Sequence, residues 1–402
     1  MKTLVILLSI AGLAIAGAVE QVSRFLDPAI PADPHAFFDL RMRQSKLPGL
    51  AVAILRDGEV VWAEGFGRLD AGIDQPVTPE TLFHVASVSK TITGTAVMQL
   101  VEQDLIGLDD AVDNYVSFPM RNPAFPESPI TIRQLLTHTS SLHDDEETYM
   151  AQYTLDAGGG DPEISLRDFV EGYLRPGGLW YDAEANFLDT PPGSTFEYSN
   201  IGFALLGLLV EQVTGMDFSD YCRANIFEPL GITGTGWRIA GVDETQLAHP
   251  HSLKRGVYEV LPHYSYATYP DGALRTSVAE YASFLQAMMN GGIGANGARI
   301  LQAKTVSEMI RTQFPELNSH QGLAWDTCQT GKLTPERCAN GGVPGHTGGD
   351  PGVFTLVFFV PDEKAGAILF TNGLPELTPG STLNLLSLVE RLVFELDRRG
   401  AE

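Results

Sequence analysis

Three short segments of this chain carry side chains whose types and spacing suit acyl-transfer chemistry. The first is Ser87-Val88-Ser89-Lys90, which stands directly before a stretch with helical periodicity. Because residues three apart on a helix lie one above the other, Lys90 could reach the hydroxyl of Ser87. A serine at a helix N-terminus feels the positive end of the helix dipole, and a buried amine with a lowered pKa could accept the serine proton. A helix cap followed by a surface lysine would give the same pattern.

The second segment, Tyr198-Ser199-Asn200, precedes a strongly apolar stretch. A phenol beside an ammonium group gives up its proton more readily. The amide of Asn200 offers a donor and an acceptor at once, which suits a side chain that holds both Lys90 and a substrate amide. Asn200 could also be the cap of a helix that begins here, and the two roles are compatible.

The third segment, His346-Thr347-Gly348-Gly349, lies just before the apolar run 353–360. Alternate side chains of a strand share a face, so we expect His346 and Gly348 on the same side. The two glycines would let a substrate approach the backbone closely, and a backbone N–H there could form half of an oxyanion hole. A glycine-rich turn into a core strand is the alternative.

The elements that must position these segments are strands at both ends of the chain and helices between them. Apolar runs at 50–55 and 60–66 flank Asp57-Gly58, a residue pair typical of tight hairpins. A second pair of strand-like runs, 353–360 and 365–370, is joined by a turn. We therefore expect an α+β fold, with one antiparallel sheet built from both ends of the chain, an inserted and mainly helical lobe, and the active site between them.

Three helices are predicted in that lobe and one at the C-terminus. Apolar residues between 92 and 101 recur with helical spacing, which indicates a helix with one buried face. The stretch 203–213 is apolar on nearly every side, so we expect a fully buried helix ended by Gly215. Residues 277–289 form another helical pattern, and apolar residues between 385 and 396 would pack a terminal helix on the sheet.

The chain has 402 residues, 44% of them hydrophobic, and a formal net charge of −24. This composition excludes a disordered acidic tail protein, and the anionic surface argues against binding nucleic acid. Residues 1–18 combine a basic start, a short apolar run and small residues, which predicts a cleaved signal peptide and export to the periplasm or the medium. An uncleaved membrane anchor is the alternative. Residues 19–402 contain no repeat and no run of membrane length, so we expect one two-lobed catalytic domain without a stable membrane span.

Export bears on the three cysteines of the chain. Cys328 and Cys338 flank a short stretch with the composition of a loop. In an oxidising compartment they could form a disulfide, which would leave Cys222 alone in a helix. The alternative is that all three thiols are reduced.

Two other groups of polar residues could bind ions but favour plainer interpretations. His249, His251 and His263 could hold a metal, yet the proline between the first two is typical of a loop. Asp144-Asp145-Glu146-Glu147 could bind a cation, although an exposed acidic loop is the better interpretation. A role at a helix terminus or in packing suits His138 better than catalysis. No Gly-x-Ser-x-Gly is present, which sets aside an α/β-hydrolase, and no compact metal motif is present, so we expect no metal site.

In this order and at these spacings, the three segments resemble the signature of the β-lactamase-related serine hydrolases. That family includes class C β-lactamases, D-stereospecific peptidases and several esterases. The resemblance runs from about residue 37 to the C-terminus and includes 131–140, which is similar to the family's LLTHTSG segment, with Ser141 where glycine is usual. Further similar segments are Gly107-Leu108-Asp109-Asp110, Pro192-Gly193, Pro229-Leu230-Gly231-Ile232 and Gly272-Ala273-Leu274-Arg275-Thr276.

The resemblance implies a role for each matching residue. Ser87 would be the nucleophile that becomes acylated, and Lys90 and Tyr198 would share the general acid and base work, without the sequence deciding which of them holds the proton. Asn200 would orient Lys90 and the substrate. The N–H groups of Ser87 and Gly349 would form the oxyanion hole, and water would release the acyl group. The resemblance implies no metal and no cofactor.

His346 stands where β-lactamases and carboxypeptidases of this family usually have lysine. A lysine is charged at pH 7 and can grip a substrate carboxylate, whereas a histidine with its ordinary pKa near ~6.5 is mostly neutral. The net negative charge of the chain also disfavours substrates that are bound through a carboxylate. We therefore expect small ester, amide or peptide substrates, with esters favoured over β-lactams. Activity as a β-lactamase or as a D-Ala-type or D-amino-acid peptidase is the alternative.

A hypothesis of another class is a non-catalytic relative that keeps the pocket to bind peptides or to assemble. The presence of Ser87, Lys90 and Tyr198 favours the enzyme. The insert 172–189, with its aromatic residues, could line the acyl side of the pocket or pack on itself. The sequence leaves the oligomeric state open.

Overall fold

The computed structural model describes residues 33–70, 72–254, 257–329, 338, 342–374, 388, 391 and 392. The predicted signal peptide, 1–18, lies outside the described residues, as does most of the predicted C-terminal helix.

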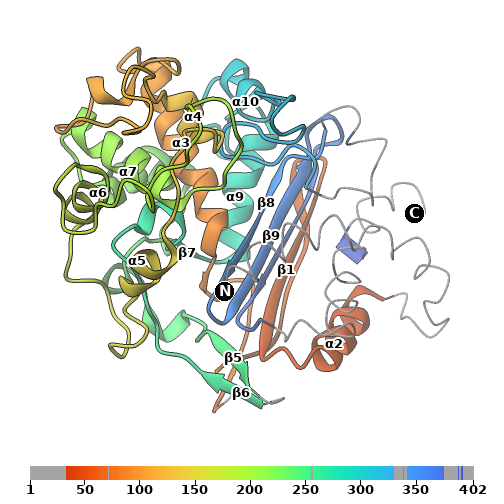
Figure 1. Cartoon of the computed structure of the whole chain (residues 1–402). Coiled ribbons are helices and arrows are strands. Elements are labelled where there is room, and N and C mark those ends of the chain that lie inside the picture. Colours follow the sequence, from red (N-terminus) through yellow and green to blue (C-terminus); the bar gives the residue numbers. More distant parts are fainter. Residues whose placement is uncertain are drawn as a thin grey trace.

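The described residues contain one six-stranded sheet, in which all neighbouring strands are antiparallel (Figure 1). Its strands are β1 (Gly49–Arg56), β2 (Glu59–Asp70), β3 (Ile73–Pro76), β8 (Gly345–Asp350), β9 (Val353–Val360) and β10 (Ala365–Thr371), in the order β3-β2-β1-β10-β9-β8. β1 pairs with β10, with Leu50 opposite Thr371. Strands from the two ends of the described chain therefore meet at the centre, which confirms the predicted sheet.

The two turns predicted between strands lie at the residues that predicted them. Asp57 and Gly58 have φ of +52° and +81°, the positive values that a two-residue hairpin turn requires. Between β9 and β10, Pro361–Glu363 forms a single 3-10 turn that ends at Lys364, whose φ is +48°. Both predicted hairpins are therefore confirmed.

Both faces of the sheet are covered (Figure 1). The side chains of β1 are divided between two cores. Ala51, Ala53 and Leu55 belong to the large core shared with the helical lobe. Their neighbours Leu50, Val52 and Ile54 belong to a second core with α2 (Pro34–Gln44), Leu388 and Leu392. Because it is buried on both faces, β1 is apolar along nearly its whole length instead of alternating.

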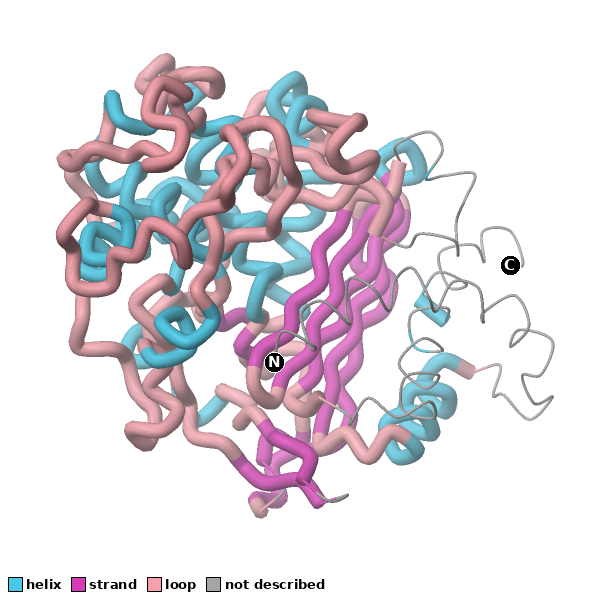
Figure 2. The backbone as a smooth tube through the Cα atoms, viewed as in Figure 1, coloured by secondary structure: helices cyan, strands magenta, loops and turns pink. Residues whose placement is uncertain are grey.

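The lobe between the terminal strands is made of helices and long loops, which gather on one side of the sheet (Figure 2). Its helices are α3 (Ser89–Glu102), α4 (Ile132–Leu136), α5 (Glu146–Ala151), α6 (Leu166–Leu174), α7 (Asn200–Thr214), α8 (Phe218–Cys222), α9 (Val278–Met289) and α10 (Ala303–Met309). Two small ribbons, β4 (Phe83–His84) with β7 (Arg275–Thr276) and β5 (His251–Lys254) with β6 (Val257–Val260), complete it.

The helix that carries Lys90 is more deeply buried than its pattern predicts. We expected one buried face, but every residue of α3 from Ser89 to Leu100 is buried. Its threonines count as polar in the sequence, yet their hydroxyls donate to backbone carbonyls: Thr91 to Val88 at 2.7 Å and Thr93 to Pro270 at 2.6 Å. A threonine that is satisfied in this way can face a protein core.

The predicted buried helix is confirmed as α7, in which every residue from Ile201 to Val210 is buried and which ends at Gly215 with a φ of +72°. Within the described ranges, no single helix has the length and hydrophobicity of a membrane span. One bent pair, Asn200–Thr214 with Phe218–Leu230, reaches those values only when its two parts are taken together.

Candidate active site

Ser87 lies in a tight turn that leads into α3. The 3-10 turn Ala86–Val88 continues directly into the helix at Ser89, two residues before the predicted start. Ala86 has a φ of +48°, a conformation that costs a residue with a side chain about 1–3 kcal/mol and is typical of functional sites. The turn is anchored to the segment before β7, because the N–H of Val85 donates to the carbonyl of Leu274 at 2.9 Å.

The amine of Lys90 is fully buried and touches the serine. Its Nζ lies 3.1 Å from Ser87 Oγ, 2.7 Å from Asn200 Oδ1 and 2.7 Å from the backbone oxygen of Asp271. The structure thus brings together side chains from the first two segments, and Lys90 is not the surface lysine of the alternative interpretation.

Tyr198 flanks the same amine with the face of its ring. Lys90 Nζ lies 4.9 Å from the centre of that ring. On its other side, Tyr198 stacks on His138 at 4.2 Å, and the Nδ1 of His138 accepts the N–H of Ser199 at 3.1 Å. Burial, together with the charge of Lys90, lowers the pKa of His138 well below its ordinary value. His138 is therefore neutral, with its proton on Nε2, and it packs against the site as the sequence suggested.

The N-terminus of α7 is capped by Ser199, whose Oγ accepts the N–H of Gly202 at 3.0 Å. Asn200 is the first helical residue and not the cap, so its side chain is left for Lys90. Asp144 supports the same turn: its carboxylate accepts Ser199 Oγ at 2.8 Å and the N–H of Asn200 at 2.6 Å. Asp144 is enclosed by protein, and this burial raises its pKa. The prediction of an exposed acidic loop is therefore wrong for this residue.

The third segment forms β8, the edge strand beside the nucleophile turn. Gly345 exchanges backbone hydrogen bonds with Asp326, at 2.8 and 3.0 Å, on the side away from β9. Because backbone groups alternate along a strand, the N–H of Gly349 also points away from β9, out of the sheet edge. That orientation leaves it available as an oxyanion donor.

The sequence predicts that Gly348 leaves room for a substrate. In the structure it leaves room for the nucleophile turn instead. A Cβ on Gly348 would lie 2.4 Å from the backbone oxygen of Val85 and 2.3 Å from Thr355 Oγ1. Thr355 Oγ1 itself donates to the same Val85 oxygen at 2.8 Å. Strand and turn are thus in direct backbone contact, which no other residue type would permit.

His346 is held beside the site without a charge. Its Nδ1 lies 2.6 Å from the backbone oxygen of Thr347, so that nitrogen carries the proton and donates. The ring is surrounded by protein although part of it still reaches solvent, and this burial together with the charge of Lys90 lowers the pKa of His346 to about 4. Thr347 and Gly349 are exposed on the other face of the strand.

Asp271 is a buried carboxyl that the sequence analysis did not single out. The hydroxyl of Tyr149 donates to its two oxygens at 3.0 and 3.1 Å, while its backbone oxygen accepts from Lys90. Burial raises the pKa of Asp271 to about 7, although the charge of Lys90 opposes the shift.

This shift predicts how stability depends on pH. An unfolded aspartate releases its proton near pH ~4, whereas the folded protein keeps that of Asp271 until about pH 7. The free energy of unfolding should therefore fall as pH rises from about 4 to about 7. Asp271→Asn stays neutral, so urea unfolding should find it more stable relative to wild type at pH 8 than at pH 5. The exposed Asp189→Asn is the control, and a pH-independent difference for Asp271→Asn would contradict the assignment.

The remaining predicted residues have contacts of their own. Cys328 and Cys338 are joined in a disulfide, and Cys222 is a buried free thiol in α8. His249 and His263 stack at 3.8 Å, but the described residues contain no group of three side chains that could hold a metal. In the insert 172–189, Trp180 packs on Phe169 of α6 at 5.0 Å.

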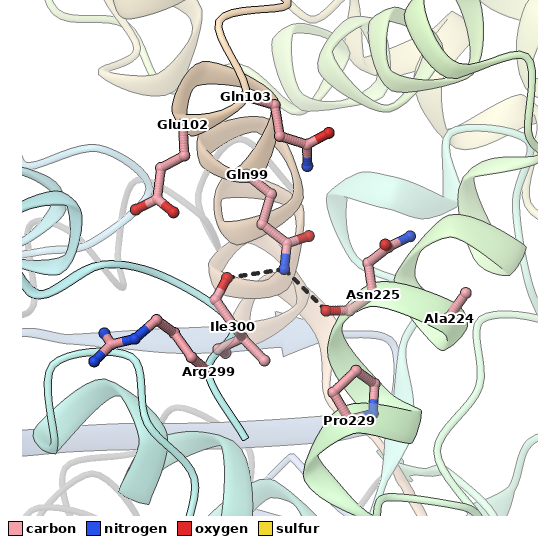
Figure 3. Close-up of a pocket in the computed structure, with 8 residues that line it drawn as sticks. All are labelled: Gln99, Glu102, Gln103, Ala224, Asn225, Pro229, Arg299 and Ile300. Carbon is pink, nitrogen blue, oxygen red and sulfur yellow. Dashed lines mark hydrogen bonds between the residues drawn. The ribbon is translucent and has the colours of Figure 1, made fainter. Parts of the chain in front are cut away.

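A hollow of about 350 Å³ at the far end of α3 is distinct from this site (Figure 3). Gln99 crosses it and donates to the backbone oxygens of Asn225 at 2.9 Å and Ile300 at 3.0 Å. These contacts tie three segments together, and the residues that line the hollow include no serine, threonine, cysteine or lysine. We therefore assign the chemistry to the surroundings of Ser87.

Comparison with known proteins agrees with this geometry. A family model described as Beta-lactamase matches residues 35–389. Penicillin-binding protein 4 of Amycolatopsis lactamdurans is 28% identical over 356 residues, which cover 84% of this chain and 84% of that protein. Penicillin-binding protein 4* of Bacillus subtilis (strain 168) is 25% identical over 336 residues, 78% of this chain and 66% of that protein.

The same likeness extends to solved structures. An octameric penicillin-binding protein homologue from Pyrococcus abyssi matches with a TM-score of 0.68 at 25% identity, over 88% of this chain and 76% of that chain. The expected α+β architecture is thereby confirmed as the β-lactamase/transpeptidase-like fold. Since the family model spans most of the chain, this protein belongs to the β-lactamase family, whose relatives are serine hydrolases.

Proposed function

We propose that this protein is an exported serine hydrolase that cleaves small esters, and more slowly amide or peptide bonds, through a covalent acyl-enzyme. The observation that carries the proposal is the set of partners around Lys90 Nζ. Three oxygens surround this amine: Asn200 Oδ1 and the Asp271 carbonyl, both at 2.7 Å, and Ser87 Oγ at 3.1 Å. The serine hydroxyl is therefore within the distance at which a proton can pass directly to Nζ.

This arrangement suits Lys90 as the base for acylation. The oxygen of Ser87 would attack the substrate carbonyl while its proton passes to Nζ. The N–H groups of Ser87 and Gly349 would hold the negative oxygen of the tetrahedral intermediate. Collapse would break the bond to the alcohol or amine, and Lys90 or the phenol of Tyr198 would return a proton to the leaving group. Water would then attack the acyl-enzyme by the same route and release the acid.

Esters are preferred because the site offers no permanent cation at His346. The pKa of His346 is lowered to about 4 by burial and by Lys90, so the imidazole stays neutral at pH 5 to 8. A neutral ring can donate a hydrogen bond but gives little attraction to a carboxylate. Substrates whose recognition depends on a free carboxylate, such as penicillins, should therefore bind less well than neutral esters.

A substrate panel with one substitution tests this argument. Wild type should hydrolyse short-chain p-nitrophenyl esters well and nitrocefin poorly. His346→Lys should raise kcat/KM for nitrocefin about 10- to 100-fold relative to the ester, because a charge-assisted hydrogen bond contributes about 1.5–3 kcal/mol. His346→Gln, which remains neutral, is the matched control and should give no such gain. Efficient hydrolysis of nitrocefin by wild type, without hydrolysis of esters, would contradict the proposal.

Two other functions are tested by the same panel. The names of its relatives, two penicillin-binding proteins, favour β-lactams or D-amino-acid peptides as the second candidate substrate class. D-amino-acid amides therefore belong in the panel beside the esters and nitrocefin. For a non-catalytic binder, a fluorophosphonate probe would leave Ser87 of the folded protein unlabelled.

Export rests on the predicted signal peptide and is supported by the Cys328–Cys338 disulfide, since disulfides persist in oxidising compartments. Fractionation of cells that express the full chain tests it. A protein that stays in the cytoplasm with residues 1–18 still attached would refute export without affecting the proposed chemistry.

A further inference from the structure

The residue after Gly349 carries a buried carboxylate with three hydrogen-bond donors. Asp350 ends β8, and its side chain is only 9% exposed. Oδ2 accepts from His84 Nε2 at 2.9 Å and from the hydroxyl of Tyr266 at 3.0 Å, and Oδ1 accepts from the hydroxyl of Tyr153 at 3.0 Å. Three segments that are distant in sequence thus converge on one side chain beside the glycine that the proposed mechanism uses.

His84 connects this carboxylate to the nucleophile. It belongs to β4, three residues before Ser87, and is 4% exposed. Burial lowers the pKa of His84 even though Asp350 opposes the shift, so the ring is neutral and its proton sits on Nε2, where Asp350 accepts it. Among the described residues, its Nδ1 has no hydrogen-bond partner. Asp350 therefore supplies the hydrogen bond that orients the ring, which also packs against the rings of Tyr264 and Tyr266.

The hydrogen bond between His84 and Asp350 connects the two segments that carry the oxyanion donors. Gly349 directly precedes Asp350, and the N–H of Ser87 lies on the segment that His84 begins. We infer that Asp350 and His84 are positioning residues, which fix the distance between the two oxyanion donors without touching the substrate. This inference rests on the proposed hydrolase activity. Donors that are already placed where charge develops stabilise the transition state more than the bound substrate.

The hydrogen bonds around Asp350 also continue to Lys90, the proposed base. The hydroxyl of Tyr153, which donates to Asp350, lies 3.5 Å from the hydroxyl of Tyr149, and Tyr149 donates to Asp271. The backbone oxygen of Asp271 accepts from Lys90. One buried path therefore links the support of the oxyanion strand to the support of the amine. A change at Asp350 should act through geometry on the chemical step.

Asp350→Asn tests the inference, because an amide nitrogen would replace one of the two carboxylate oxygens that accept hydrogen bonds from His84, Tyr153 and Tyr266. We expect kcat for p-nitrophenyl esters to fall about 10- to 100-fold, while KM stays within about twofold of wild type. This loss of kcat is no larger than the loss expected when an oxyanion donor is removed. The inhibition constant of a boronic acid, which imitates the tetrahedral intermediate, should rise by the same factor as kcat falls. Tyr266→Phe, which removes one donor but keeps the contact of Asp350 with His84, is the matched control and should change kcat little.

If Asp350 had a merely structural role, Asp350→Asn would lower the thermal midpoint without the parallel changes in kcat and in boronic acid affinity. If Asp350→Asn loses stability but keeps wild-type kcat and boronate affinity per active site titrated with fluorophosphonate, the inference is wrong. Should that variant fail to fold, His84→Gln and His84→Phe replace it. Gln keeps a donor for Asp350 and should retain more kcat than Phe, so equal kcat values would refute the inference. Wild type that is not labelled at Ser87 would overturn the proposed function as well, whereas an active wild type with an unaffected Asp350→Asn overturns only this inference.

Discussion

Ser87→Ala is expected to lower kcat/KM for p-nitrophenyl esters by about 10⁴-fold or more, because removal of a covalent nucleophile leaves only the oxyanion hole and binding. The loss should come without a loss of fold. Ser87 lies within the turn Ala86–Val88, which is anchored by backbone contacts and by Thr355, and none of these contacts uses the Ser87 hydroxyl. Initial rates and a thermal midpoint for each protein measure the two effects separately.

Ser89→Ala is the matched control, since Ser89 is two residues away on the same helix. Its Oγ accepts the N–H of Leu274 at 3.0 Å and faces the core instead of Lys90. That variant should lose some stability but keep fluorophosphonate labelling and most of kcat. Full esterase activity in Ser87→Ala would refute the nucleophile assignment and every step built on it.

Gly348→Ala is expected to have the second-largest effect, through the backbone alone. The added Cβ would lie 2.3 Å from Thr355 Oγ1 and 2.4 Å from the Val85 oxygen. At least one of these neighbours, and with it the nucleophile turn, must move. Overpacking of this kind costs about 1–3 kcal/mol, and because Val85 leads into Ser87, kcat should fall about 100-fold or more, as expected when a catalytic group is misplaced by about 1 Å.

Urea unfolding and steady-state kinetics check both parts of this prediction. Gly241→Ala is the control, because a Cβ there meets no atom within 4 Å. It should change neither stability nor rate. A Gly348→Ala protein with wild-type kcat would mean that strand and turn are not in the contact described for them.

The sequence predicts the elements whose pattern is local. β1, β9 and α7 are continuous apolar runs between clear stop signals, and their bounds agree with the structure within a few residues. The three chemical segments are also local, since each is a run of three or four residues. What the sequence could not provide is the set of side chains that support them from far along the chain.

Asp144 and Asp350 illustrate why the support was missed. In the sequence Asp144 begins a run of four acids, which favours a solvated loop. Only the fold places it under the N-terminus of α7, where three donors converge on it. Asp350 looks like an ordinary turn residue before Pro351, and its partners come from three separate segments. A polar residue buried by tertiary contacts carries no periodic signal.

The pairing of β1 with β10 also determines when this chain can fold. β1 is made before the helical lobe, but β10, the strand that covers its inner edge, is made only after that lobe. Until then that edge offers unpaired backbone groups to any neighbouring chain, and contacts between such distant residues form slowly. In the growing chain this edge of β1 therefore stays unpaired until β10 has been made. A product that stops before β8 would lack both the centre of its sheet and the strand beside its nucleophile.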